Sequence, residues 1–486
     1  MKFFYAPKRE VAERMYHRDK REIVEHFNSI AGQRLAWKRR NRYYYTDQIR
    51  YFRFLVPEGS TILELGCGTG DLLGALRPRR GVGIDFSEEM LKIAKKQYPD
   101  LEFHNADIES LEYWGDSFDF IIMSDVIGHL QDIEETFRIV KPFCRADTRL
   151  IISYYNFLWE PVLKLGEKLG LKMPQQHQNW LSTEDIGNLL SLADFQIVKT
   201  ESRLLIPKKI PLLSVFVNRY IGMLPGIHKL CLCRYLIARL TAPDEVKSFS
   251  TTILIPCRNE KGNIEPAIKR IPPFGHHQEI LFVDGHSTDG TLEEIEKMIH
   301  TYPDKDIKWM VQDGDGKGDA VRKGFDSATG DILMILDADL TVPPEDLPKF
   351  YRALVEGKGE FINGCRLVYP MDKQAMRFIN YLGNKFFSMM FTWLLNQRFK
   401  DTLCGTKAFF RRDYIKIRAN RGYFGDFDPF GDFDLIFGAV KQNLKVVEVP
   451  IRYRERTYGS TNIRRFQHGW LLLKMTLFAY RKIKAI

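Results

Sequence analysis

Two stretches of the chain alternate short apolar runs with helix-like sequence, and this alternation restricts the possible folds more than any other feature. In the first stretch, residues 1–201, the apolar runs are 61–65, 81–84, 119–123 and 149–154. In the second, from residue 246 on, the runs are 251–256, 279–284, 308–312 and 331–337. Each alternation predicts a parallel sheet with crossover helices. A chain of 486 residues with 44% hydrophobic content can form two such α/β domains.

Features of the whole chain favour a cytoplasmic protein. Seven cysteines form no CxxC pair, which is typical of a reducing compartment. Residues 1–50 are charged and broken, so we predict no signal peptide. No apolar stretch reaches the roughly 18 residues that a transmembrane helix requires.

A glycine-rich turn follows the first predicted strand, with Gly66, Gly68 and Gly70 at alternate positions. Such glycines let the backbone approach a ligand closely, and the helix that follows from Asp71 directs its N–H groups toward that ligand. The next strand ends at Asp85, and a carboxylate there can accept from two ribose hydroxyls.

This turn, with Glu64 before it, resembles motif I of the class I S-adenosylmethionine-dependent methyltransferases. The resemblance covers about residues 40–200 and implies a Rossmann-like domain with S-adenosylmethionine as its cofactor. It implies that the glycines line the methionine part, and that other positions contact the ribose, the adenine, and the sulfonium or acceptor. The implied cofactor-binding residues are Glu64, Gly66, Gly68, Gly70, Asp85, Asp107 and Asp125.

Two further features near this site have alternative interpretations. His129 is a candidate general base, but a lone histidine is more often structural, and here it can serve only to shape the pocket. The run Tyr43-Tyr44-Tyr45 can form a lid over the cofactor or pack into the core.

In the second stretch, an apolar strand ends in Asp337-Ala338-Asp339. Two carboxylates this close at the end of a buried strand repel each other and lose solvation unless a positive group lies between them. A divalent ion that bridges phosphates meets this need, because Mg²⁺ is usually held by one or two carboxylates and substrate oxygens.

This strand end and three other motifs resemble the family 2 glycosyltransferases of GT-A fold, and among them the dolichol- or polyprenyl-phosphate sugar synthases. The other motifs are Pro256-Cys257-Arg258-Asn259-Glu260, Asp284 with Asp289-Gly290-Thr291, and residues 316–322. The resemblance covers about residues 248–460 and implies Mg²⁺ or Mn²⁺ on Asp337 and Asp339. The implied nucleotide-sugar contacts are Pro256, Arg258, Glu260, Asp284, Lys317 and Asp337.

Two positions depart from the family pattern and leave the base and sugar specificity open. Gly285-His286 stand where family members often carry an acid and then glycine, and Val342 stands where they often carry histidine.

Further downstream the same resemblance implies catalytic positions. Asp432 and Asp434 lie where inverting members place an acid, as a base or to orient the acceptor, and residues 401–409 resemble the acceptor-side loop. Arg456 begins a segment like the family's Arg-x-x-Gly-x-Ser and can pair with phosphate oxygens. With Asp339, these complete the predicted catalytic set of the second domain.

Three segments combine basic and apolar residues: 202–245, 376–399 and 461–486. Residues 202–243 hold seven Lys or Arg and no acid, which favours either a helix in a bilayer interface or a basic helical hairpin between domains. We expect peripheral attachment to the inner face of the cell membrane. A nucleic-acid partner is not expected, since the basic segments are apolar enough for lipid.

Together these features predict a bifunctional enzyme. Residues 1–201 would transfer a methyl group to an unknown acceptor, and 246–460 would transfer a sugar from a nucleotide-sugar to polyprenyl phosphate at the membrane. The alternative is a glycosyltransferase acting on a lipid or glycan hydroxyl, with a regulatory S-adenosylmethionine-binding module. The oligomeric state stays open.

Overall fold

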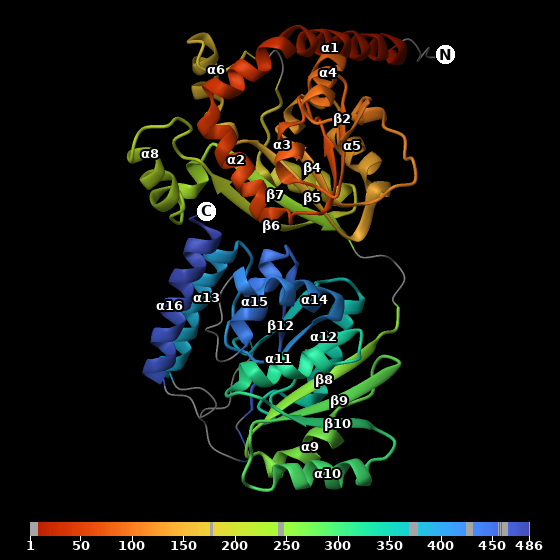
Figure 1. Cartoon of the computed structure of the whole chain (residues 1–486), viewed down its shortest axis with the longest axis vertical. Helices are drawn as coiled ribbons and strands as arrows, with labels where there is room; N and C mark the ends of the chain where they lie inside the picture. Colours follow the sequence, from red (N-terminus) through yellow and green to blue (C-terminus); the bar gives the residue numbers. More distant parts are fainter. Residues whose placement is uncertain are drawn as a thin grey trace, which may run out of the picture. The chain divides into compact units, whose positions relative to one another are not determined.

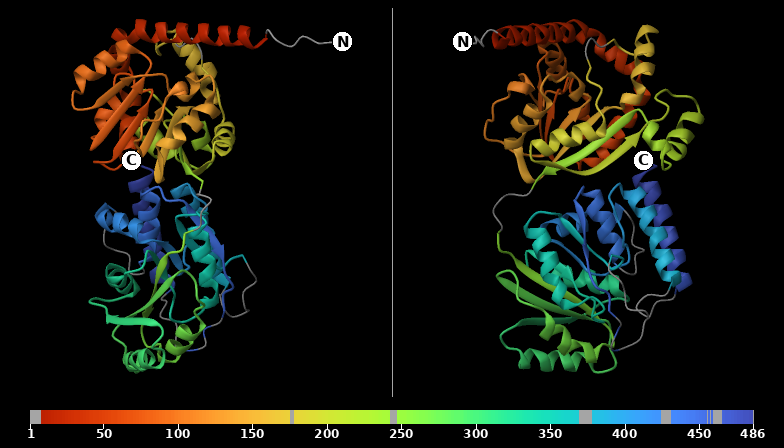
Figure 2. Two further views of the ribbon diagram at one scale, coloured as in Figure 1. Left: turned by 90° about the vertical axis from the view of Figure 1, so that its right-hand side faces the viewer. Right: turned by 180° about the vertical axis from the view of Figure 1, so that it is seen from behind.

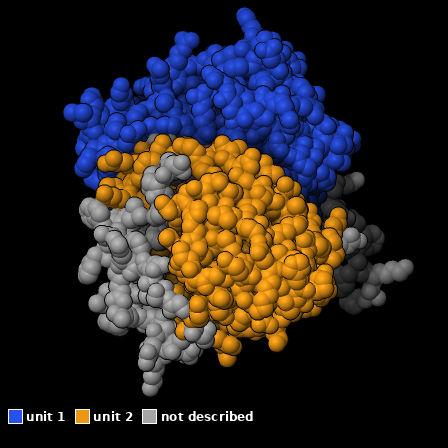
Figure 3. All heavy atoms as spheres, turned by 60° about the horizontal axis from the view of Figure 1, so that its bottom comes forward, with its two compact units in different colours: residues 1–240, 486 blue, residues 241–485 orange. Residues whose placement is uncertain are grey.

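The computed structural model describes residues 8–174, 178–241, 247–368, 378–423, 431–454, 456, 458 and 465–485. In helical residues 8–20, 378–382 and 465–472 it describes the backbone alone. The chain divides into two compact units, Met1–Leu240 and Thr241–Ala485 (Figure 3). Each unit contains its own sheet, as the two alternating stretches predict.

The first unit is built on a sheet whose described strands follow the order β3-β2-β1-β4-β5-β7-β6 (Figure 1). Its strands are β1 Thr61–Leu65, β2 Arg80–Asp85, β3 Glu102–Asn105, β4 Phe118–Ser124, β5 Cys144–Tyr155, β6 Phe195–Arg203 and β7 Cys233–Leu240. Within the group β1 to β5, each strand is parallel to the strands beside it. Strand β7 runs antiparallel to both β5 and β6. The sheet is therefore mixed, not wholly parallel as the rhythm of the sequence suggests.

Helices pack around this sheet. They are α1 Lys8–Arg40, α2 Arg42–Leu55, α3 Asp71–Leu76, α4 Glu88–Gln97, α5 Ile133–Val140, α6 Glu160–Lys168, α7 Thr183–Leu192 and α8 Leu213–Phe216. Ser87 caps α4, because its side chain accepts a hydrogen bond from the Met90 N–H. Glu88 and Glu89 lie in the first turn of this helix, where the helix dipole favours acids.

The predicted boundary at residue 201 differs from the structure, because the sheet continues to Leu240. Residues 233–240 form β7, an inner strand of the sheet, and not a helix of a linker. The apolar run Tyr235–Ala238 is buried against both neighbouring strands. A short apolar run fits a buried strand and a helix equally well by periodicity, which explains the difference.

The second unit has a sheet with the described strand order β10-β9-β8-β11-β13-β12-β14. Its strands are β8 Ser250–Cys257, β9 His277–Asp284, β10 Asp306–Val311, β11 Ile332–Ile335, β12 Phe361–Cys365, β13 Lys407–Phe410 and β14 Val446–Pro450. Its helices are α9 Lys261–Arg270, α10 Thr291–Thr301, α11 Lys317–Ser327, α12 Leu347–Val355, α13 Phe378–Leu395, α14 Arg411–Ala419, α15 Asp432–Lys441 and α16 Arg465–Ile483. Strands β10, β9, β8 and β11 are parallel, and β13 is antiparallel to both its neighbours.

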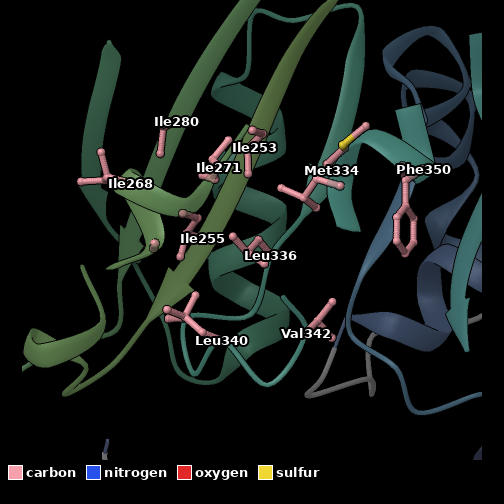
Figure 4. Close-up of a cluster of buried hydrophobic side chains, with 14 of the residues drawn as sticks. Ile253, Ile255, Ile268, Ile271, Ile280, Met334, Leu336, Leu340, Val342 and Phe350 are labelled. Carbon is pink, nitrogen blue, oxygen red and sulfur yellow. The ribbon is translucent and has the colours of Figure 1, made fainter. Parts of the chain in front are cut away.

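A cluster of branched aliphatic side chains forms the core beneath the parallel strands (Figure 4). Ile253 and Ile255 of β8 meet Met334 of β11 and Leu336 just beyond it. Val342 belongs to this cluster and is 2% exposed. At this position, where family members often carry histidine, the chain thus has an apolar side chain that belongs to the core.

Helices α13 and α16 lie side by side in the second unit (Figures 1 and 2). Trp393 of α13 stacks on Tyr480 of α16 with ring centroids 5.6 Å apart. Among the described residues, no helix combines the length and the hydrophobicity needed to span a bilayer. Residues 376–377 and 461–464, the starts of two predicted membrane-facing segments, lie outside the described residues.

Candidate functional sites

The first site lies at the carboxyl ends of β1, β2 and β4, where the strand order reverses between β1 and β4. Ligands bind at such switch points in open α/β sheets. Gly66 follows β1, Asp85 ends β2 and Asp125 follows β4. All three line a cavity of about 860 Å³, so the structure brings the predicted strand-end residues together.

The glycine-rich turn adopts a backbone that needs glycine. Gly66, Gly68 and Gly70 have φ angles of 74°, 53° and 72°. A Cβ atom on Gly66 would lie 2.6 Å from Cγ2 of Val126. The Asp85 carboxylate closes the turn by accepting from the Gly68 N–H at 2.7 Å, and it also accepts from Ser87. Burial raises the pKa of Asp85 despite these bonds.

Glu64 is a buried acid directly beside this turn. Its carboxyl accepts from the Leu73 N–H at 3.1 Å. Burial raises the pKa of Glu64 to about 8, although Lys38 acts in the opposite direction. Without a bound cation the carboxyl is therefore largely protonated at neutral pH.

This raised pKa predicts a proton release on cofactor binding. If the ammonium of S-adenosylmethionine pairs with Glu64, it favours the ionised carboxylate and lowers its pKa. At pH 6.5 we expect close to one proton to be released per bound cofactor, and none from Glu64→Gln. Calorimetry in buffers of different ionisation enthalpy counts these protons. Equal release by both proteins would show that the ammonium binds elsewhere.

Asp125 is held at the cavity by helix α2. Its carboxylate accepts from the Tyr44 hydroxyl at 2.6 Å and from the Gln48 amide at 2.9 Å. Ser153 Oγ lies 3.2 Å from its other oxygen. From the sequence, the Tyr43–Tyr45 run is expected to form a lid or to pack into the core. In the structure, Tyr44 positions Asp125 and Tyr45 lines the cavity.

Helix α1 supplies cations to this site that sequence reasoning missed. Lys38 Nζ donates to Thr69 Oγ1 at 2.9 Å and also pairs with Asp71. Arg34, one turn earlier, lines the cavity. The only sequence signal was the position of these basic residues on a helix that precedes the glycine motif.

Two more predicted residues border the same space. His129 lines the cavity, and its ring meets Phe27 edge to face with centroids 5.4 Å apart. Asp107 borders a small hollow of about 30 Å³ that shares Asp85 and His129 with the large cavity. The Asp107 carboxylate accepts from the Glu109 N–H at 3.0 Å.

The second site, like the first, lies at the carboxyl ends of parallel strands. The strand order reverses between β8 and β11, and the predicted acids follow the carboxyl ends of β8, β9 and β11. Glu260 comes after β8, Asp284 ends β9, and Asp337 and Asp339 follow β11. Pro256 lies within β8, whereas Arg258 is exposed in the turn.

A lysine lies between two of the acids. Lys317 Nζ is 2.6 Å from the Asp337 carboxylate and 3.9 Å from Asp432. Burial acts to lower the pKa of Lys317, but the two carboxylates outweigh it and raise that pKa. Gly405 covers this pair so closely that a Cβ would lie 2.2 Å from Asp337 Oδ2.

An arginine joins the other two acids. Arg456 NH2 lies 3.0 Å from Asp339 and 3.2 Å from Glu260. The other oxygen of Asp339 accepts from Thr341. Burial raises the pKa of Glu260, with Arg456 opposing the shift. The structure thus places Arg456 beside Asp339.

Asp432 and Asp434, which the sequence could not separate, have different surroundings. Asp432 accepts from the fully buried Lys407 at 2.9 Å and lies near Lys317. Asp434 lies 3.5 Å from Arg322 and borders another hollow, together with Lys441. Of the two acids, only Asp432 is joined to Lys317 by an ion-pair distance in the described structure.

Asp284 has a buried oxygen that lacks a hydrogen-bond partner among the described residues. Its Oδ2 accepts from the Ser287 N–H at 2.9 Å, while Oδ1 has no hydrogen-bond partner among the described residues. A buried acceptor without a partner is unfavourable, and an N–H of a bound base would satisfy it. His286, at the position where relatives often have glycine, has a φ of 59°.

The donor set of this site fits a divalent ion only together with a substrate. Among the described residues, no three His, Cys, Asp or Glu side chains are arranged to hold a metal. Asp337 and Asp339 are partly exposed and each is paired with a cation. Mg²⁺ keeps few protein ligands and takes its remaining oxygens from phosphate and water, so two carboxylates suffice.

Comparison with known proteins finds two families on one chain. A family model described as glycosyl transferase family 2 matches residues 252–418, and one described as a methyltransferase domain matches residues 37–200. The glycosyltransferase AglJ of Haloferax volcanii is 31% identical over 247 residues, which cover 50% of this chain and 74% of the relative. The dolichol-phosphate mannosyltransferase of Pyrococcus furiosus is 30% identical over 236 residues, covering 48% of this chain and 63% of the relative.

A solved structure is also similar to part of the chain. The SAM-dependent methyltransferase of Thermotoga maritima, described as a possible histamine N-methyltransferase, shares 19% identity and has a TM-score of 0.37. The match covers 45% of this chain and all of that protein.

Proposed function

This chain belongs to the family 2 glycosyltransferases and also carries a SAM-dependent methyltransferase domain, and from that membership we propose a bifunctional enzyme of glycolipid synthesis. The second unit would transfer a sugar from a nucleotide-sugar to polyprenyl phosphate. The first would transfer a methyl group from S-adenosylmethionine to a glycolipid or a small molecule.

One observation carries the glycosyl-transfer proposal: Lys317 and Arg456 each form an ion pair with an acid that follows β11. Both cations can pair with the oxygens of a diphosphate. Divalent ions, held by Asp337 and Asp339 with the diphosphate, would supply electrostatic stabilisation of the departing group. Asp284 Oδ1, which has no partner among the described residues, would accept from an N–H of the base.

The proposed reaction needs no strong base. An oxygen of the acceptor phosphate bonds to the anomeric carbon while the bond from that carbon to the diphosphate breaks, and its electron pair leaves with the nucleoside diphosphate. A phosphate monoester is already ionised near neutral pH. Asp432, fixed by Lys407, would therefore keep Lys317 in place and orient the anionic acceptor through that ammonium.

A polyprenyl acceptor suits the helix pair α13 and α16. These helices expose large apolar side chains, namely Phe386, Met389, Leu473 and Leu477. Lys474 and Arg481 are exposed on α16 beside them. An apolar surface with adjacent cations fits the interface of an anionic leaflet, so we place the enzyme peripherally on the inner face of the cell membrane.

The methyl-transfer proposal rests on the cavity at β1 and β4. The carbon–sulfur bond of the sulfonium breaks, its electron pair stays on sulfur as S-adenosylhomocysteine, and an acceptor oxygen or nitrogen bonds to the methyl carbon. His129, which lines the cavity, would accept the proton that this atom loses.

The test offers the full-length protein radiolabelled UDP- and GDP-sugars with Mg²⁺ and polyprenyl phosphate, and follows label into the organic phase. One donor is expected to label the lipid. Asp432→Asn should lower that rate at least tenfold, because Lys407 loses its buried partner and the acceptor its orientation. Asp434→Asn, the matched control, should stay within about twofold.

Two results would contradict this account. If donor is hydrolysed but no lipid is labelled, the acceptor is a glycan or lipid hydroxyl and not polyprenyl phosphate. If Asp434→Asn loses more activity than Asp432→Asn, the acids have been assigned in the wrong order.

A further inference from the structure

The first unit exposes a group of large apolar side chains that its fold does not use. They come from residues 157–171, around helix α6, and from residues 210–230, around helix α8. The exposed members are Phe157, Leu158, Val162, Leu165, Leu169, Leu171, Ile210, Leu212, Leu213, Val215, Phe216, Tyr220, Leu224 and Leu230. Leu212 is the most exposed of them at 88%. We call this set the α6–α8 surface.

The two halves of this surface are joined by hydrogen bonds. Trp159 Nε1 donates to the Leu230 carbonyl at 2.7 Å, and Asn156 Nδ2 donates to the Lys229 carbonyl at 2.9 Å. Figures 1 and 2 show α6 and α8 on the same flank of the unit. The α6–α8 surface is therefore one region, larger than the scattered apolar residues of an ordinary protein surface.

This surface borders the mouth of the large cavity. Val162 and Leu163 of α6 line the cavity, and so do Pro207 and Lys208 from the strand-to-helix connection before α8. A chain-like ligand in the cavity could thus continue over the apolar side chains of Val162, Leu163 and Pro207, with the Lys208 ammonium beside it.

The charge is of one sign on the α8 half of the surface, whereas Glu160 and Glu167 on the α6 half are paired with Lys164 and Lys172. Residues 202–243 contain no Asp or Glu, and Lys209 and Lys229 accompany the exposed apolar side chains of residues 210–230. Arg219 lies on the π-helical turn Val217–Ile221 between them. Exposed apolar residues with interspersed cations match the interface of an anionic bilayer.

Inside the cavity, Arg34 has no carboxylate within ion-pair distance among the described residues. Its one hydrogen-bond contact is the Met173 sulfur, 3.9 Å from NH1. Lys38, one turn further along α1, is in contrast paired with Asp71. Asp125 and Asp85 act on this half-buried guanidinium only from beyond ion-pair distance, so a ligand anion that comes closer can pair with it.

We propose that the methyl acceptor is an anionic amphiphile drawn from a lipid bilayer. Its phosphate or carboxylate pairs with Arg34 in the cavity, and its apolar chain leaves past Val162 and across the α6–α8 surface into the membrane. This inference rests on the proposed methyltransferase function and names its substrate class.

The test uses the full-length protein with S-adenosylhomocysteine and vesicles of phosphatidylcholine and phosphatidylglycerol that carry a diazirine-labelled alkyl phosphate. After illumination, mass spectrometry locates the cross-links. We expect labels on residues 157–171 and 207–216. Val162→Glu should reduce these labels at least tenfold, while Leu192→Glu, an exposed residue outside the cavity lining, should leave them unchanged.

Arg34 is tested separately with the same vesicles. Arg34→Gln should lower labelling by the alkyl phosphate at least fivefold and remove its advantage over an alkyl trimethylammonium probe. Binding of S-adenosylhomocysteine should stay within about twofold. If Arg34→Gln weakens the nucleoside instead and leaves labelling intact, Arg34 serves the cofactor and the anionic part of the proposal is overturned.

Other outcomes of the cross-linking experiment also test this proposal. Labels confined to residues 241–485 would mean that the α6–α8 surface does not meet lipid, and label only from free probe without vesicles would exclude the bilayer as its source. Cross-linking requires no turnover, so labelling without methyl transfer to any lipid would show that the cavity binds an anionic amphiphile but would overturn its assignment as the methyl acceptor. The methyltransferase function itself would fail only if small-molecule acceptors were not methylated either.

Discussion

Replacing Asp339 with asparagine is expected to lower glycosyl transfer by about a hundredfold to a thousandfold, in the range found when one transition-state stabiliser is removed. The change keeps the size of the side chain but removes the charge that pairs with Arg456 and would help to hold a divalent ion. Arg456 then keeps its ion pair with Glu260 and shifts toward it, away from the diphosphate.

The fold should tolerate this change. The Asp339 side chain is 21% exposed and lies in the loop after β11, so no core packing is lost. Rates are measured as sugar label in the organic phase at saturating donor. Asp304→Asn, an exposed acid with no such partners, is the control and should match the unchanged protein. If Asp339→Asn retains more than half of the activity, Asp339 does not act on the donor.

The second large effect concerns stability: Asp401→Asn should destabilise the second unit by about 3–5 kcal/mol, the range for breaking one side of a buried ion pair. Asp401 is fully buried and accepts from Arg366 Nε at 2.7 Å and from NH2 at 2.9 Å. It also accepts from Asn384 and Leu403. Without its charge, the Arg366 guanidinium stays buried beside Tyr453 and uncompensated.

This stabilisation depends on pH in a defined direction. Burial opposes ionisation, but Arg366 outweighs it and lowers the pKa of Asp401 from its ordinary value of 3.8 to about 2. A depressed pKa contributes stability above the unfolded value that is lost as the pH falls through the folded value. The difference between Asp401→Asn and the unchanged protein should therefore shrink between pH 4 and pH 2.

Urea unfolding followed by hydrogen exchange in peptides of the second unit measures this difference. Asp326→Asn removes a surface ion pair with Arg418 and should change stability by less than about 1 kcal/mol. A loss of similar size in both variants would refute the structural role of Asp401.

Much of both sites could be predicted from the sequence because their key residues are local motifs at strand ends. The turn around Gly66 and the acids Asp85, Asp337 and Asp339 lie where their strands predict. The position of each motif depends on a few residues on either side, so it can be predicted without knowledge of distant contacts. The reversal of strand order in each sheet then brings the motifs together.

The remaining contacts could not be predicted because they join distant parts of the chain. Tyr44 meets Asp125 across 81 positions, and Arg456 meets Asp339 across 117. Asp401 belongs to a segment that resembles an acceptor loop, yet its carboxylate is turned inward to Arg366. Side-chain direction at such positions depends on tertiary packing, which no local pattern encodes.

The central claim is that one chain carries two independent transferase sites, and double labelling tests it most directly. The full-length protein receives tritiated S-adenosylmethionine, a ¹⁴C-labelled nucleotide-sugar and membrane lipid extract, and both labels are counted in the organic phase. We predict that both labels enter lipid. Asp339→Asn should remove only the sugar, and Asp85→Asn should lower the methylation of added acceptor while sugar transfer continues. Sugar transfer without any methylated product over a broad acceptor panel, despite tight binding of S-adenosylmethionine, would contradict the claim and make the first unit a regulatory module.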